Sequence, residues 1–321
     1  MLTSELLSRV EVIGIPTRTN FRGVHLREIA LIRGEKRWGE FSPFKDYSIE
    51  RDALWLQAAL EAVDEKFPPP MRTRVLVNAT LPEVPVAQVG EVLSWFPGSQ
   101  TVKVKVGTAN DEERIEEVFQ IIPDAQLRLD ANGMFSIAQA QDFFSTLYNK
   151  YRHRIEYVEQ PCASLAENSA LNLPIPIAID ENLRLGDDLG EINRVADVVI
   201  VKVAPLGGIS KALKIISQLD KPVVISSALE SSVGLSAGIA LAAHLPDDLS
   251  CGLGTAALLS GDIVRDPLLP QNGAVPVTEV EVVEELLGRY RLEEVQVASW
   301  HNRISSAHKK LMENLERKEL L

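Results

Sequence analysis

The stretch Val102-Lys103-Val104-Lys105-Val106 alternates valine with lysine. Alternation of this kind is typical of a β-strand, whose successive side chains point to opposite faces. Both lysines therefore share one face, and the three valines share the other. The next run, 111–115, has an acidic start and apolar residues at helical spacing, and another strand-like run follows at 127–130. The stretch is therefore predicted to be the strand of a βα unit.

The same alternation of strand and helix continues along most of the chain. Strand-like runs recur about every 20 to 30 residues, at 75–78, 102–106, 127–130, 156–159, 177–180, 197–203, 222–226 and, more weakly, 251–253. A doubly wound nucleotide-binding sheet would carry a glycine-rich turn after its first strand, and residues 78–82 have none. Seven or eight such units favour a parallel barrel. We predict an α/β fold with an incomplete TIM barrel, of the (β/α)7β kind, over residues 71–265.

The first 70 residues have a different pattern. Residues 24–41 predict a β-hairpin and residues 49–66 an amphipathic helix, which together predict an α+β capping domain over residues 1–70. Pro68-Pro69-Pro70 marks its boundary with the barrel, because consecutive prolines cannot continue a helix.

Short strand signals return after the predicted barrel, at 274–277 and 279–282. A charged helix is expected over 300–321, and no function is assigned to it. We predict that the segment 266–321 returns to the capping domain.

Composition excludes several classes of protein. The formal net charge of -12 disfavours nonspecific binding to nucleic acid or to anionic membranes, both of which need clustered Lys and Arg. The longest uncharged stretch, 231–246, is shorter than the ~20 apolar residues of a membrane span. Charged residues interrupt residues 1–14, so we do not expect this stretch to provide the apolar core of a secretory signal. Cys162 and Cys251 are too few and too far apart for a disulfide scaffold or a zinc site, so we expect a cytoplasmic protein.

Charged residues close the predicted strands one after another. These strand-end residues are Lys103 with Lys105, then Asp130, Glu159, Asp180 and Lys202. The ends of parallel barrel strands meet at one rim, so the six side chains are expected to converge. Each acid alone is better explained as a helix N-cap after its strand or as a solvated loop charge. Three acids bracketed by lysines instead predict a metal site, and carboxylates without histidine suit Mg²⁺, or Mn²⁺, better than zinc.

Strand parity adds detail to this set. Arg128 shares the face of Asp130, while Leu127 and Leu129 point toward the helices. Glu181 competes with Asp180 as a ligand, but lies on the opposite face if Asp180 points inward. Lys103 has a simpler explanation as a salt-bridge partner.

These motifs resemble the enolase superfamily over most of the predicted barrel. The segments that carry the resemblance are 102–106, 127–133 (LRLDANG), 157–161 (YVEQP), 178–181 (AIDE) and 200–202 (IVK). The Lys-x-Lys strand is similar to the branch that contains muconate cycloisomerases, dipeptide epimerases, N-acylamino-acid racemases and o-succinylbenzoate synthases. Members of this branch combine a capping domain with an incomplete barrel.

The resemblance implies roles for the strand-end residues. Asp130, Glu159 and Asp180 would hold Mg²⁺, Lys105 would be the general base, and Lys202 a cation across the substrate, since enzymes of this superfamily combine a Lys or His base with Mg²⁺. Lys103, Arg128 and Asn132 would support them. Positive charge near Lys105 is expected to lower its pKa toward neutrality. A proton α to a carboxylate is too weakly acidic for an amine unless a metal binds the developing charge.

The segment 225–234 (ISSALESSVG) bears on the choice of reaction. Its serines and a following helix N-terminus could bind a substrate carboxylate, or could simply form a turn with helix capping. It resembles the o-succinylbenzoate synthases, as does the capping-domain loop 19–23, and the short lobe suggests the actinobacterial type. The resemblance implies substrate contacts from Arg22, Ser226, Ser227, Glu230 and Ser231.

The reaction implied is a lyase step of menaquinone biosynthesis, the dehydration of 2-succinyl-6-hydroxy-2,4-cyclohexadiene-1-carboxylate. Two lysines on opposite sides of a substrate would also suit racemisation of N-succinylamino acids, or dipeptide epimerisation. A barrel that only binds a small acid is the third hypothesis, and it predicts the loss of an essential group.

Overall fold

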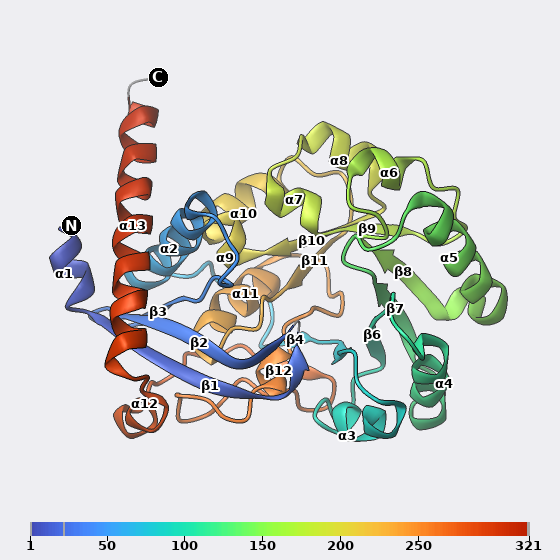
Figure 1. The fold of residues 1–321 in the computed structure, drawn as a ribbon, viewed down its shortest axis with the longest axis horizontal. Helices are drawn as coiled ribbons and strands as arrows, with labels where there is room; N and C mark the ends of the chain where they lie inside the picture. Colours follow the sequence, from blue (N-terminus) through green and yellow to red (C-terminus); the bar gives the residue numbers. More distant parts are fainter. Residues whose placement is uncertain (1, 22, 320–321) are drawn as a thin grey trace.

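The computed structural model describes residues 2–21 and 23–319, and it combines a capping domain with a parallel barrel sheet (Figure 1). The capping domain has its own core, in which Phe41, Trp55 and Trp300 are buried together. Its elements are α1 (Thr3–Leu7), β1 (Val10–Phe21), β2 (Val24–Arg33), β3 (Trp38–Phe41) and α2 (Ile49–Asp64).

The three strands of the capping domain form an antiparallel sheet in the order β1-β2-β3. The hairpin expected over 24–41 is confirmed, with Ala30 opposite Phe41. Strand β1 was not predicted. Residues 12–15 are buried on both faces, so the first half of the strand lacks the alternation that marks a half-buried strand.

The barrel sheet is parallel, and its strands follow one another in chain order from β5 to β11. The strands are β5 (Ala79–Leu81), β6 (Thr101–Lys105), β7 (Gln126–Asp130), β8 (Ile155–Glu159), β9 (Ile177–Ile179), β10 (Val198–Lys202) and β11 (Val223–Ser226). The intervening helices are α3 (Val89–Ser94), α4 (Asp111–Ile121), α5 (Ile137–Tyr151), α6 (Leu165–Ser169), α7 (Glu181–Leu185), α8 (Leu189–Val195), α9 (Val203–Leu206), α10 (Ile209–Ile216) and α11 (Ser232–His244). Short 3-10 turns lie at Val86–Gln88, Arg152–Arg154 and Thr255–Leu258.

Two isolated β-bridges connect the last strand of the barrel sheet to the segment before its first strand. Cys251 bridges Val77 in parallel, and the following Gly252 bridges Ser226 at the end of β11. The weak strand signal at 251–253 therefore lies between the first and last strands without becoming a regular strand. The incomplete barrel with a capping domain agrees with the predicted fold class.

The first strand signal, 75–78, coincides only in part with a regular strand. Its beginning belongs to β4 (Arg74–Leu76), which pairs with β12 (Ala274–Pro276), while β5 begins after it and pairs with β6. The 274–277 signal does form a strand, but β12 pairs with β4, whereas we expected this part of the chain to pack on the capping domain. It stays with β4 because Ala274 and Val275 are buried there.

The rest of the C-terminal segment does reach the capping domain. Helix α12 (Glu284–Tyr290) precedes α13 (Glu294–Glu319), which begins earlier than the predicted 300 and runs beside α2 (Figure 1). Trp300, Ile304 and Leu311 bury one face of α13 in the capping-domain core. The signal at 279–282 contributes only the bridge between Val264 and Val282.

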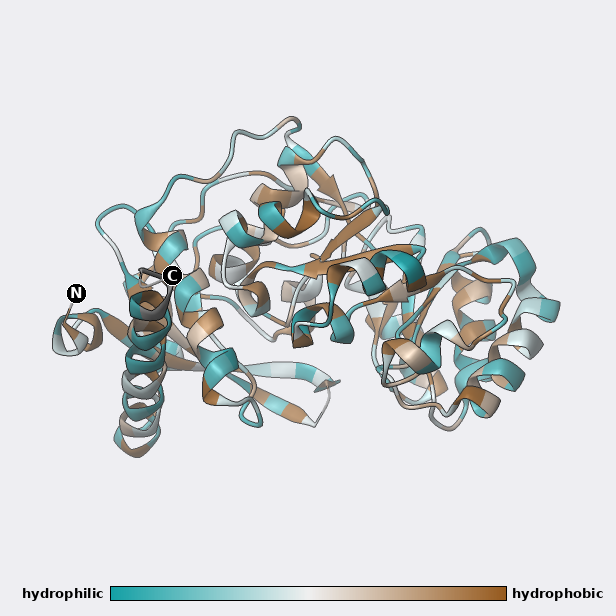
Figure 2. Cartoon of the chain, turned by 90° about the horizontal axis from the view of Figure 1, so that it is seen from above, coloured by the Kyte–Doolittle hydropathy of each residue, from teal (hydrophilic) through white to brown (hydrophobic). Residues whose placement is uncertain are grey.

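Hydropathy follows this arrangement (Figure 2). The central strands are brown, and the outer helices carry much of the teal, as expected for a barrel whose apolar side chains face its helices. Within residues 2–21 and 23–319, no helix combines the length and the apolar character needed to cross a lipid bilayer.

Candidate active site

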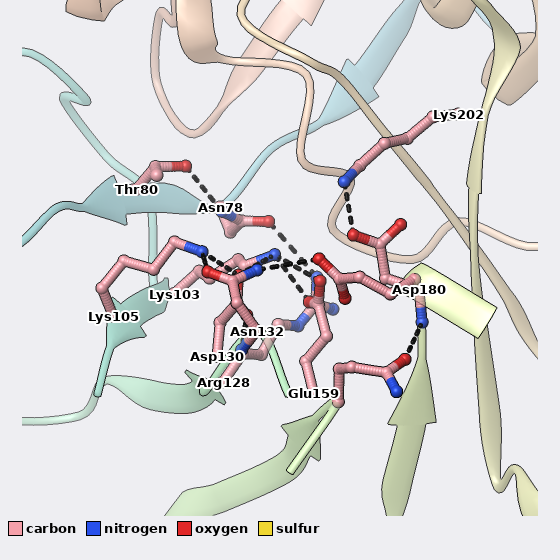
Figure 3. A network of polar contacts seen from close by, with 12 residues as sticks. Asn78, Thr80, Lys103, Lys105, Arg128, Asp130, Asn132, Glu159, Asp180 and Lys202 are labelled. Carbon is pink, nitrogen blue, oxygen red and sulfur yellow. Dashed lines mark hydrogen bonds and ion pairs between the residues drawn. The ribbon is translucent and has the colours of Figure 1, made fainter. Parts of the chain in front are cut away.

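Strand register brings the predicted site residues to one rim. Lys105 on β6 lies opposite Asp130 on β7, and Asp130 lies opposite Glu159 on β8. Asp180 follows β9 directly, and Lys202 closes β10. We call Lys103, Lys105, Asp130, Glu159, Asp180 and Lys202 the strand-end cluster; Figure 3 shows its carboxylates between Lys105 and Lys202.

Every carboxylate of the cluster contacts a lysine. The Lys103 Nζ donates to both carboxylate oxygens of Glu159, at 2.7 and 2.6 Å, and lies 2.9 Å from Asp130 Oδ2. The Lys105 Nζ lies 2.7 Å from that same Asp130 oxygen. On the other side, the Lys202 Nζ donates to Asp180 Oδ2 at 2.6 Å. The three carboxylates are each 1% exposed, so these ion pairs offset the cost of burying them.

The pKa values of the two carboxyl groups Glu159 and Asp180 shift in opposite directions. Burial alone would lower the pKa of Lys103, but Asp130 and Glu159 outweigh it and raise that pKa above its ordinary value. Burial and the nearby Asp130 raise the pKa of the Glu159 carboxyl to about 7. Burial also acts to raise the pKa of Asp180, but Lys202 and Arg184 hold it below its ordinary value. The surroundings of Glu159 can therefore accept further positive charge.

The donor set fits a hard divalent cation by its chemistry. It consists of three buried carboxylates from neighbouring strand ends, without histidine or cysteine, and oxygen ligands of this kind suit Mg²⁺. In the described part of the chain, no group of three or more Asp, Glu, His or Cys side chains is already arranged around a common metal position. Lys103 and Lys202 contact the carboxylate oxygens that would serve as ligands.

A cavity opens at this rim. From the strand-end cluster it is lined by Lys103, Lys105, Asp130 and Lys202. The other lining residues are Phe21, Phe44, Tyr47, Thr80, Arg184, Pro205, Ser226, Ser227, Ala228, Gly252 and Thr255. The capping domain therefore covers a polar floor with three aromatic side chains.

The predicted supporting residues Asn132 and Arg128 lie in different places: Asn132 contacts a cavity lysine, whereas Arg128 does not reach the cavity. Asn132 accepts a hydrogen bond from Lys105 and donates one to Glu181 at 3.0 Å, so it holds the lysine at the cavity. Arg128 is buried below the rim, where it pairs with Glu156 at 2.8 Å and donates to the Ser250 carbonyl. It does not line the cavity, and its charge is directed toward Glu156.

The predicted substrate-binding residues divide into two groups. Ser226 and Ser227 line the cavity. Ser231 instead donates its backbone N–H and its hydroxyl to Glu40 of the capping domain, at 3.1 and 2.5 Å, and Glu230 accepts from the Ala228 N–H at 2.6 Å. Neither Ser231 nor Glu230 lines the cavity, so the structure does not support substrate contacts from them. Arg22 lies outside the described residues.

Ser231 and Glu230 belong to a second buried polar group at the junction of the two domains. We call Arg27, Glu40, Ser42, Glu230 and Ser231 the domain-contact cluster. The Gly234 N–H also donates to Glu40, at 3.1 Å, so a capping-domain carboxylate already occupies the N-terminus of α11. That is where we expected a substrate carboxylate.

Several cavity residues were not predicted. Phe44, Tyr47 and Arg184 lie in loops or a short helix with no strand periodicity. Arg184 is one turn of α7 beyond Asp180, and this spacing was the available signal for it.

Comparisons with known proteins agree with this architecture. Residues 12–63 match the model for the enolase N-terminal domain-like family, and residues 91–281 match the enolase C-terminal domain-like family. The fold is similar to a muconate lactonizing enzyme from Pseudomonas fluorescens, with a TM-score of 0.75 and 19% identity, over 88% of this chain and 98% of that one. It is also similar to an N-succinyl Arg/Lys racemase from Bacillus cereus, with a TM-score of 0.73 and 19% identity, over 88% and 97% of the two chains.

Closer relatives are found among curated sequences. An o-succinylbenzoate synthase of Mycobacterium leprae is 45% identical over 287 residues, which cover 86% of this chain and 84% of the relative. The o-succinylbenzoate synthase of Mycobacterium ulcerans is 44% identical over 281 residues, which cover 84% of each chain. The chain therefore belongs to the o-succinylbenzoate synthase family, a family of lyases within the enolase superfamily.

Proposed function

We propose that this chain dehydrates 2-succinyl-6-hydroxy-2,4-cyclohexadiene-1-carboxylate to 2-succinylbenzoate, as a step of menaquinone biosynthesis. The observation that carries the proposal is that Lys105 and Lys202 line one cavity with Asp130, in a chain that is 45% identical to a curated o-succinylbenzoate synthase. The substrate would be a small dianion, which suits a cavity floor with three lysines. Cys162 and Cys251 are both free, which supports a reducing, cytoplasmic setting.

Lys105 would act as base and then as acid. Its amine takes the proton from the carbon α to the ring carboxylate and then returns a proton to the departing hydroxyl on the same face, so that water leaves and the ring becomes aromatic. Lys103 and Lys105 lie against the same oxygen of Asp130, at 2.9 and 2.7 Å. The surroundings hold Lys103 as a cation beside the carboxylate that Lys105 also contacts.

Lys202 would remain protonated throughout. Its ion pair with Asp180 holds the ammonium at the cavity wall, across the carboxylates from Lys105 (Figure 3). From there it would stabilise the negative charge that develops on the substrate as the proton leaves. Phe21, Phe44 and Tyr47 would limit the access of water to that charge.

Enolase superfamily enzymes typically use a divalent metal ion. We propose Mg²⁺, or Mn²⁺ in its place, with Asp130, Glu159 and Asp180 as the residues that would hold it. Bound there, the ion would supply positive charge to the substrate carboxylate next to the proton that Lys105 removes.

A direct assay tests the proposal. Purified protein with Mg²⁺ is mixed with the cyclohexadiene substrate, and product formation is followed by ultraviolet absorbance. We expect turnover that EDTA abolishes and added Mg²⁺ restores. A protein that fails to dehydrate this substrate, but exchanges the α-proton of N-succinylamino acids in D₂O by NMR, would be a racemase instead.

A further inference from the structure

The cavity contains a cation that the mechanism above does not use. Arg184 lines the cavity from α7, and its side chain is 12% exposed. The three cavity lysines are each held by a carboxylate of the strand-end cluster. Arg184 extends toward the capping domain, where its Nη1 donates to the Tyr47 hydroxyl at 3.2 Å.

Two acids hold the guanidinium group in position. Its Nη2 donates to Glu181 Oε1 at 2.8 Å, and its Nε lies 3.7 Å from Asp180 Oδ1 without a hydrogen-bond partner. Glu181 also accepts from Asn132, at 3.0 Å, so its position does not depend on Arg184 alone. A guanidinium has five N–H donors, and the hydrogen bonds to Tyr47 and Glu181 use only two of them.

Tyr47 is also held rigidly. Its ring packs edge-on against Phe44, with centroids 5.7 Å apart, and lies 6.3 Å from the Trp55 ring. The Arg51 guanidinium lies over it, 5.3 Å from the centroid. Because the phenolic oxygen accepts from Arg184, its own hydrogen remains available to donate to a ligand in the cavity.

We propose that Arg184 and Tyr47 together bind the second carboxylate of a dicarboxylate substrate, the one on the succinyl chain that takes no part in proton transfer. This inference rests on the proposed function. A planar guanidinium suits a carboxylate better than an ammonium does, because it can donate two parallel hydrogen bonds. Tyr47 belongs to the capping domain and Arg184 to the barrel, so a carboxylate bound by both would hold the two domains together over the reacting ring.

Binding of two ligands tests the pair. The Mg²⁺-loaded protein is titrated by calorimetry with 2-succinylbenzoate and with 2-butanoylbenzoate, in which a methyl group replaces the distal carboxylate. We expect the wild type to prefer 2-succinylbenzoate by roughly 10- to 100-fold, since hydrogen bonds to charged groups have that strength. Arg184→Gln should bring the two affinities to within about threefold of each other, and Tyr47→Phe should reduce the preference in part.

The ratio of the two affinities distinguishes direct binding of the carboxylate by Arg184 from an indirect role in positioning Asp180. If Arg184→Gln weakens both ligands equally, Arg184 only positions Asp180 and the proposal is overturned. Arg194→Gln, which removes an exposed arginine paired with Glu191 on α8, is the matched control and should leave the ratio unchanged. A wild type that neither turns over the cyclohexadiene nor binds 2-succinylbenzoate would contradict the proposed function as well, whereas an active wild type without ligand preference would contradict this inference alone.

Discussion

The strand-end cluster and the domain-contact cluster are both buried groups of charged side chains, but they have different partners. In the strand-end cluster, carboxylates pair with lysine ammonium groups, and one side of the cluster faces a cavity. In the domain-contact cluster, Glu40 is satisfied mainly by backbone N–H groups and hydroxyls, and none of its five residues lines that cavity. Residue type and burial alone therefore do not identify an active site.

The domain-contact cluster serves to join the two domains. Arg27 of the capping domain donates to the Leu229 and Ala228 carbonyls of the barrel, at 2.9 and 3.2 Å. Glu40 completes the same contact at the N-terminus of α11, where a carboxylate is favoured by the helix dipole. The strand-end cluster, in contrast, keeps side chains that can exchange protons or partners at the cavity.

Among these predictions, the loss of Lys105 should have the largest effect on activity. A small effect would contradict the assignment of catalysis to the strand-end cluster. We expect Lys105→Ala to lower kcat for dehydration by about 10²- to 10⁴-fold, because proton transfer loses its base. Steady-state kinetics measure this, with circular dichroism to check the fold. Lys214→Ala, an exposed lysine on α10, is the control and should leave kcat unchanged. Comparable activity in the two variants would remove Lys105 from the mechanism.

The next largest effect should come from Glu40, which should make the free energy of unfolding depend on pH. Burial and the neighbouring Glu230 raise the pKa of Glu40 to about 7 in the folded protein, whereas an unfolded Glu titrates near pH ~4.3. The folded state therefore binds this proton more tightly, and its contribution to stability falls as the pH rises from about 4.3 to about 7, by at most about 4 kcal/mol.

The matched variant isolates this contribution. Glu40→Gln should show a flatter fall in the free energy of unfolding across that pH range, measured by urea denaturation at pH 5, 6, 7 and 8. Glu159 also has a raised pKa, but it is present in both proteins, so its effect cancels in the difference. Parallel curves for the two proteins would show that Glu40 does not titrate with folding.

Substitutions of one serine in the domain-contact cluster and one in the cavity wall should have the smallest effects, and they should affect different properties of the protein. Ser231→Ala removes a hydroxyl bonded to Glu40 and should cost about 1 kcal/mol of stability without changing KM. Ser227→Ala alters the cavity wall, where the hydroxyl lies 2.6 Å from that of Thr255, and should raise KM roughly 2- to 10-fold. Thermal denaturation and kinetics on both variants test this. A raised KM in Ser231→Ala, with an unchanged KM in Ser227→Ala, would indicate that Ser231 contacts the substrate.

Much of the site could be predicted because it depends on local rules. The alternation in residues 102–106 places Lys103 and Lys105 on one face, and the parallel register then aligns Lys105, Asp130 and Glu159. Local rules could not choose the partner of Ser231. A serine at a helix N-terminus suits a substrate carboxylate and a protein carboxylate equally well, and the one that occupies it, Glu40, is 191 positions away.

The sequence by itself determined the parallel barrel and the chemistry of its rim, because strand parity and the direction of βα units follow from neighbouring residues. Only the tertiary structure decided what covers that rim. Tyr47 and Arg184 are 137 positions apart, and their meeting depends on how the capping domain docks on the barrel. Docking of this kind is the sum of many weak contacts between distant segments, which no local pattern records.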